Sequence, residues 1–157
     1  MGSYPRPAQL DIVYGRFPYS IAPDQPGPQP HYCLVLDVFA DETTGEPWVI
    51  IALGTSQGTN ELYAGEFLVH PHDAPFAKTR LAKATKFSLS RGGLAKLPYN
   101  ETWFAVPPSR RGSGQTDPKI GVLDEKFYTR QLRAAGQAVD VSESLKALEA
   151  HPVGTLG

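Results

Sequence analysis

The sequence predicts a mainly β protein, a small and strongly bent β-barrel or sandwich with helices added at its C-terminal end. Three observations support this class. Six short runs of strand-forming residues follow one another before residue 107. The 15 glycines and 15 prolines among 157 residues indicate frequent turns. A helical pattern occurs only in the last third of the chain, and the length suits one domain spanning 1–157.

The first half of the chain reads as strands separated by turns. Apolar Leu10, Ile12 and Tyr14 alternate along 10–17, which predicts the first strand. Five prolines between 18 and 30 then predict a long exposed loop. The next two β-branched and aromatic runs, separated by a turn-forming DETTGE, predict a hairpin over 32–40 and 47–54.

Three further strands are expected over 65–70, 84–90 and 101–106, which closes the predicted barrel at about 8–106. Along the second of these, Phe87 alternates with Lys86, so we expect the ring in the core and the amine at the surface. The polar PPSRRGSGQTDP predicts a loop over 107–119.

The C-terminal part reads as a helical extension over 120–150. Asp124 is a good N-cap, and Tyr128, Leu132 and Ala135 follow at the spacing of one helical face. A second short helix is expected from about Ser142. The final PVGTLG is expected to fray.

Composition narrows the possible environments and partners. No apolar run approaches the roughly 20 residues of a membrane span, no signal peptide is expected, and the single Cys33 permits no internal disulfide, so we expect a cytoplasmic protein. The net charge of −1 conceals an uneven distribution. Residues 1–77 hold two basic and nine acidic side chains, whereas 78–111 hold eight basic and one acidic. Such a segment either balances the acidic part or binds a polyanion.

The polar residues that could carry chemistry lie at strand ends. His31 opens a strand after the proline-rich loop, either as a simple strand cap or as a proton carrier. The cluster TSQGTN at 55–60 follows a buried strand directly. Its hydroxyls and amides either form hydrogen bonds to the backbone of a local turn or bind a phosphate or base edge. We expect Trp48 and Trp103 to lie in the core. If either is exposed, its ring could stack on an unpaired base.

Metal binding is not expected. His70, His72 and Asp73 include common zinc ligands, but the intervening proline suits a turn at a strand end and no second thiol is present. We therefore expect neither a metal site nor a cofactor.

The segments LDIVYGRFPYS, QPHYCLVLDV and VIIALGTSQ, with the later ATKFSLS and GLAKLPYNETWF, together resemble the MazF/PemK family of toxin endoribonucleases. The resemblance covers about 10–106. It implies an SH3-like barrel, usually a homodimer, with a possible protein antitoxin. It also implies metal-independent cleavage of single-stranded RNA by the ribose 2′-hydroxyl.

The family's Thr-Ser pair matches Thr55 and Ser56, whereas its Arg-Pro pair is replaced by His31 and Tyr32. The resemblance therefore implies a catalytic centre at His31 and Thr55, with chemistry altered by the imidazole. The alternative is a catalytically silent barrel that binds nucleic acid or protein. A third possibility is a structural or inhibitory protein whose cationic segment faces an acidic partner. The expected RNA contacts are Arg16, Tyr19, Ser56, Gln57, Lys83, Lys86 and Arg91.

Overall fold

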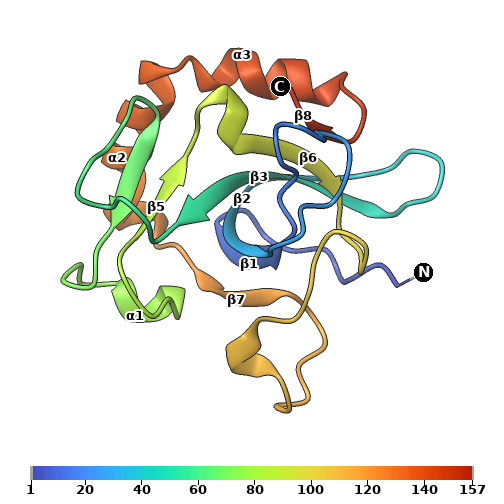
Figure 1. The fold of residues 1–157 in the computed structure, drawn as a ribbon, viewed down its shortest axis with the longest axis horizontal. Coiled ribbons are helices and arrows are strands. Elements are labelled where there is room, and N and C mark those ends of the chain that lie inside the picture. Colours follow the sequence, from blue (N-terminus) through green and yellow to red (C-terminus); the bar gives the residue numbers. More distant parts are fainter. Residues whose placement is uncertain (1, 157) are drawn as a thin grey trace.

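The computed structural model describes residues 2–156 as a curled, half-barrel antiparallel sheet with two C-terminal helices, which confirms the predicted fold class (Figure 1). The sheet has eight strands, and its main path runs β4-β5-β3-β2-β1-β7. The strands are β1 (Asp11–Gly15), β2 (His31–Ala40), β3 (Pro47–Thr55), β4 (Glu66–Val69), β5 (Thr85–Ser88), β6 (Leu94–Pro98), β7 (Lys119–Val122) and β8 (Gly154–Thr155).

The sheet curls because β3 changes partner along its length. Residues from Trp48 to Ala52 pair with β6, whereas Gly54 and Thr55 pair with β5. The β2–β3 register also shifts between Val35 and Asp37, and such irregularities bend and twist a ladder. The predicted hairpin over β2 and β3 is confirmed, and the last two residues of β3 continue the sheet into β5.

The central strands bury both of their faces. Ile12, Leu34 and Ile50 enter one core, which the helices cover, while the alternate residues of the same strands enter a second. Trp103 and Phe104 pack into the second core. This two-sided burial explains the nearly continuous apolar runs, since alternation marks only strands with one solvated face.

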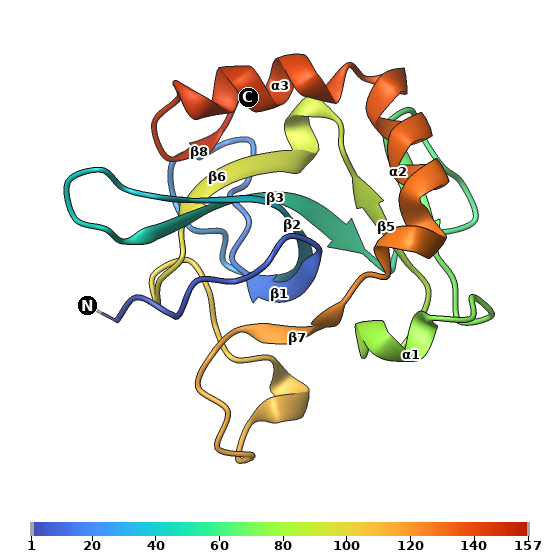
Figure 2. The ribbon, with the colours of Figure 1, turned by 180° about the vertical axis from the view of Figure 1, so that it is seen from behind.

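Helix α2 (Glu125–Ala138) and helix α3 (Val141–Glu149) confirm the two predicted helices, and Figure 2 shows them along one side of the sheet. The Asp124 carboxylate accepts the backbone N–H of Phe127 at 2.9 Å, so it is the N-cap that the sequence predicts. Tyr128 and Ala135 are buried against the sheet. The shorter elements are α1 (Phe76–Thr79), η1 (Arg91–Gly93) and η2 (Pro108–Arg110).

The strand predicted over 101–106 is wrong. Backbone N–H groups of Trp103 and Phe104 donate to the Asn100 carbonyl, so this segment is a tight turn that drives both rings inward. The strand in this region is β6, which the flanking glycines and lysine of GGLAKLP obscure. Strand β7 pairs with β1, so the sheet extends past the predicted 8–106 boundary, and residues 120–122, predicted to begin the helical extension, are a strand instead.

The prediction of a fraying C-terminal tail is also wrong. Gly154 and Thr155 pair with β6, and the Thr155 N–H donates to the Pro23 carbonyl at 3.1 Å. The end of the chain thus holds the proline-rich loop, a non-local contact that leaves no local signal in PVGTLG.

Across residues 2–156, the helices are too short or too polar to cross a lipid bilayer.

Candidate functional site

A pocket of 380 Å³ lies at the end of the half-barrel where β2 begins and β3 ends. It brings together five of the residues that the sequence singled out, namely His31, Thr55, Ser56, Gln57 and Lys83. The C-terminal tail does not fill it, because β8 pairs with β6 instead. The pocket size lies within the range typical of small-molecule sites.

His31 is held at the rim by strand pairing. Its backbone lies opposite Gly15 in the β1–β2 ladder, and the half-buried side chain borders both this pocket and a second one of 320 Å³. Burial lowers the pKa of His31 below its usual 6.5, because desolvation disfavours the charged ring. With a pKa below 6.5 the ring is mostly neutral at pH 7, and among residues 2–156 no side chain forms a hydrogen bond or ion pair with this imidazole at the edge of the cavity.

Thr55 and Ser56 stand where β3 leaves the sheet. The Thr55 Oγ1 accepts the Gln57 backbone N–H at 3.0 Å. This hydrogen bond forms a local turn, which is one of the two alternatives that the sequence offers for the TSQGTN cluster. Accepting this bond leaves the hydroxyl proton free to be donated into the pocket. The neighbouring Gly54 is packed closely, since a Cβ there would lie 2.4 Å from the Tyr32 carbonyl oxygen.

Two aromatic rings complete the wall, and the sequence reasoning missed them. Tyr14 and Tyr32 are cross-strand neighbours, and their ring centroids lie 5.1 Å apart. Both line the pocket. Exposed aromatic faces beside cations are typical of single-strand nucleic-acid sites. The available signal was weak, because each tyrosine also fits the apolar alternation of its own strand.

The cationic segment divides into side chains that are already engaged and side chains that are not. Lys78 pairs with Asp124, Lys86 pairs with Glu66, and Lys96 and Arg110 donate to backbone carbonyls. In the described part of the chain, the others have no hydrogen-bond or ion-pair partner; they are Arg80, Lys83, Arg91 and Arg111.

Lys86 departs from the expected surface position. Its Nζ lies 3.0 Å from the Glu66 carboxylate and 3.0 Å from the Glu61 carbonyl, and the side chain is buried. The predicted orientation of Phe87 into the core is confirmed. An engaged and buried ammonium offers little to a phosphate, so Lys83 is the lysine of this segment that lines the pocket.

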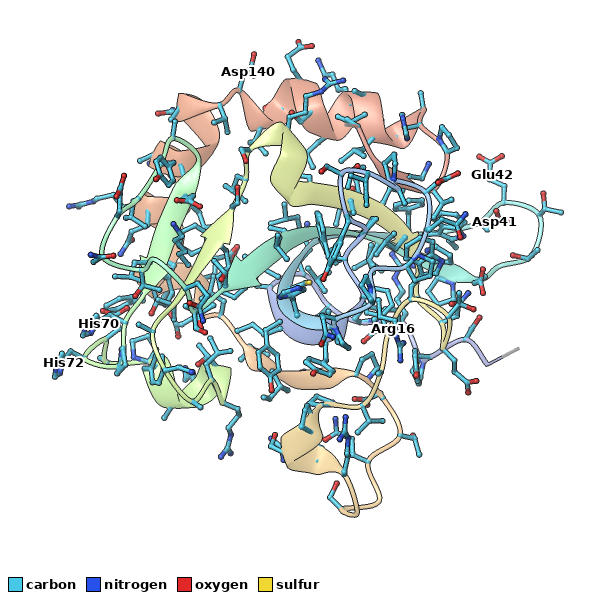
Figure 3. The ribbon with its side chains drawn as sticks, viewed as in Figure 1. Arg16, Asp41, Glu42, His70, His72 and Asp140 are labelled. Atoms are coloured by element: carbon cyan, nitrogen blue, oxygen red, sulfur yellow. The ribbon has the colours of Figure 1, made fainter. Side chains whose placement is uncertain are left out.

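Of the three remaining predicted contacts, Tyr19 lines the second pocket, whereas Arg16 and Arg91 line neither of the two. Exposed Tyr19 lines the second pocket, and Gly92, next to exposed Arg91, lines it too. Arg16 donates from Nη1 to the Phe104 carbonyl at 3.3 Å, so its guanidinium supports the turn at 100–104 (Figure 3).

Of the two tryptophans, Trp103 is buried as expected, whereas Trp48 is only partly buried and its ring lies 6.4 Å from that of Phe39.

The HPHD turn is held by hydrogen bonds within it and by one from helix α2. The His70 Nδ1 accepts the backbone N–H of His72 at 3.0 Å, and Asp73 accepts the Tyr128 hydroxyl at 2.6 Å. Figure 3 shows both imidazoles at the outer edge of the molecule. Residues 2–156 contain no cluster of three or more His, Cys, Asp or Glu side chains suited to a metal ion.

Comparison with models of known protein families finds no match for this chain, and comparison with curated proteins finds no similar sequence. The fold and the pocket therefore define the class: a mainly β, curled half-barrel protein with a polar and aromatic cleft at one end.

Proposed function

We propose that the chain binds single-stranded RNA in the 380 Å³ pocket and cleaves it through the ribose 2′-hydroxyl. The observation that carries this proposal is the convergence of His31, Thr55 and Lys83 on one cavity beside the paired rings of Tyr14 and Tyr32. A neutral imidazole, a hydroxyl, an ammonium and two aromatic faces are together suited to a phosphodiester between unpaired bases.

In the proposed reaction, the His31 imidazole takes the proton of the 2′-hydroxyl. The 2′-oxygen then bonds to the adjacent phosphorus, and the bond from phosphorus to the 5′-oxygen breaks. The departing oxygen takes a proton from solvent, leaving a 2′,3′-cyclic phosphate and a 5′-hydroxyl. Thr55 donates a hydrogen bond to a phosphate oxygen, and Lys83 stabilises the added negative charge.

The lowered pKa of His31 supports the role of base. A ring that stays neutral near pH 7 is ready to accept a proton, and its two nitrogens leave one free to accept while the other donates. A neutral imidazole cannot replace a guanidinium as a permanent charge, so the proposal assigns phosphate binding to Lys83 instead.

One observation favours a second candidate, an RNA-binding module that does not cut. Lys83 is the only lysine or arginine among the described residues that line the pocket. A single exposed ammonium gives less stabilisation to a doubly charged phosphorane than a forked guanidinium does. The homodimer and the protein antitoxin implied by the MazF/PemK resemblance stay predictions.

The test uses purified protein, a long single-stranded RNA and a metal chelator. We expect wild type to release products with 2′,3′-cyclic phosphate ends. His31→Gln should slow cleavage by about 100-fold, because general-base contributions are of this order, and Thr55→Val should slow it less. His72→Gln and Thr43→Val are matched controls outside the pocket and should cut like wild type.

The outcomes separate the two candidates. If wild type binds the RNA without cutting it, and Lys83→Gln no longer binds it, the binding module is favoured. Cleavage that survives His31→Gln unchanged would rule out the proposed base. Protein that neither binds nor cuts single-stranded RNA would refute both.

A further inference from the structure

Helix α2 carries a basic stripe that the RNA pocket does not use. Lys126, Arg130 and Arg133 stand four and three residues apart, which places them on one face of the helix. All three are exposed, and within residues 2–156 none has an ion-pair or hydrogen-bond partner. The opposite face is buried against the sheet through Tyr128 and Ala135. We call these three residues the α2 stripe.

A shallow surface hollow of 450 Å³ follows the α2 stripe. It is lined by the stripe, by Phe127 and by two polar residues of the helix. The Phe127 side chain is exposed, with 41% of its surface accessible, although large apolar rings are usually covered. Cations beside an accessible ring form the kind of surface on which single-stranded nucleic acid lies, because phosphates meet the charges and a base stacks on the ring.

A second hollow connects the α2 stripe to helix α1. It measures 510 Å³ and is lined by Lys78, Asp124, Lys126 and Phe127, so it shares two residues with the first. Lys78 and Asp124 neutralise one another across it at 3.0 Å. The ion pair joins α1 to the residue that caps α2, and Figure 2 shows α1 lying near the start of α2.

Helix α1 leads from this hollow to the RNA pocket. Its C-terminal cap is the unpaired and exposed Arg80, and the next three residues, ending with Lys83, line the pocket. The run of unpaired cations on these elements comprises Lys83 in the pocket, Arg80 at the end of α1, and the α2 stripe, with the neutralised Lys78–Asp124 pair between α1 and α2. We call this run the cationic track. Glu125 is the one exposed acidic residue in the first turn of α2.

We propose that the cationic track binds the part of an RNA strand that extends beyond the pocket, so that the protein prefers long single strands to short oligonucleotides. This inference rests on the proposed function, because it assigns pocket and track to one strand. An acidic protein segment would also meet the charges, but the accessible Phe127 ring and the link to the pocket favour a nucleic acid.

The test measures equilibrium binding of single-stranded RNAs of about four and about sixteen nucleotides, lengths that bracket typical single-strand sites. Both carry 2′-fluorine, which prevents cleavage through the 2′-oxygen. The variant combines Lys126→Gln, Arg130→Gln and Arg133→Gln. We expect it to bind the long RNA at least tenfold more weakly and the short RNA like wild type.

Salt dependence gives a second readout. Each lost phosphate contact lowers the slope of log affinity against log salt by about 0.7 for single strands, so the triple variant should lose about 2 from its slope with long RNA. Single changes provide the matched comparison: Arg130→Gln should weaken long-RNA binding, whereas Lys146→Gln, an exposed lysine of α3, should not.

Failure of the inference differs from failure of the proposed function. Unchanged long-RNA affinity in the triple variant would overturn the track even if His31→Gln slowed cleavage as expected. Binding of polyglutamate, lost in the triple variant while long-RNA affinity persists, would overturn it in favour of an acidic protein. A wild type that neither binds the short RNA nor cuts would refute the pocket, whatever the α2 stripe does.

Discussion

The ammonium of Lys86 lies 3.0 Å from Oε1 of Glu66 across the ladder between β4 and β5, and both side chains are largely withdrawn from solvent. The same Glu66 oxygen accepts the Tyr63 backbone N–H at 2.8 Å, and the ammonium lies 5.1 Å from the centroid of the Tyr63 ring. Because the ammonium also donates to the Glu61 carbonyl, this pair holds residues 61–63 against β5, and its loss should destabilise the fold.

Removing one partner of the pair should cost more than removing both. Glu66→Leu leaves a buried ammonium without its counter-charge, and we expect the free energy of unfolding to fall by about 3 kcal/mol. Combining it with Lys86→Met should recover most of that loss, because no buried charge then stays unpaired. Denaturant unfolding of both single variants and the double variant measures the coupling. Additive losses would show that the two charges do not interact.

Histidine 31 should make stability depend on pH below neutrality. Burial lowers the pKa of His31 in the folded state, so between 6.5 and that lower value the unfolded chain binds the proton more readily. The stability that depends on a neutral His31 is therefore fully present above about pH 6.5. It is lost as the pH falls towards the pKa of His31 in the folded state. Comparing the free energies of unfolding at pH 7.5 and 5.5 in wild type and His31→Gln isolates it. His72→Gln, at an exposed turn, should follow wild type.

The lowered pKa of His31 also predicts the pH profile of cleavage. If neutral His31 is the base, the rate should hold from neutral pH downward until the lowered pKa is reached, and then fall. Single-turnover rates over this range test the assignment. A fall that begins above pH 6.5 would contradict a base with a lowered pKa.

Gly54 should tolerate no side chain. A Cβ there would meet the Tyr32 carbonyl oxygen at 2.4 Å and the Phe87 ring at 2.7 Å, so Gly54→Ala should destabilise the fold by about 2 kcal/mol and displace Thr55. Gly92→Ala is the matched control, because nothing lies within 4 Å of its Cβ position. Unfolding midpoints measure the cost, and equal midpoints for both variants would contradict the close packing.

The C-terminal strand should restrain the proline-rich loop. Gly154 has a φ of +115°, and a Cβ there would clash with the Pro23 carbonyl, so Gly154→Ala should detach β8 and speed amide hydrogen exchange in residues 19–25. Gly112→Ala shares a positive φ of +80° but has open space around it. It should leave that exchange unchanged. Similar exchange in both variants would mean that β8 does not hold the loop.

Local chemistry in the sequence was enough to predict part of this protein. The hairpin over β2 and β3, the core position of Phe87, the Asp124 cap and the α2 face follow from alternation, β-propensity and capping within a few residues. The positions of His31 and Thr55 at strand ends and of Lys83 in the cationic segment also made them site candidates, and the MazF/PemK resemblance implied the roles of His31 and Thr55.

Tertiary structure decided where those residues meet and which charges stay available. The Tyr14–Tyr32 wall depends on register, the burial of Lys86 depends on Glu66 twenty residues away, and β8 depends on a partner strand far along the chain. The physical reason is that each of these contacts forms only when both partners are in place, so the sequence of either segment alone does not predict it.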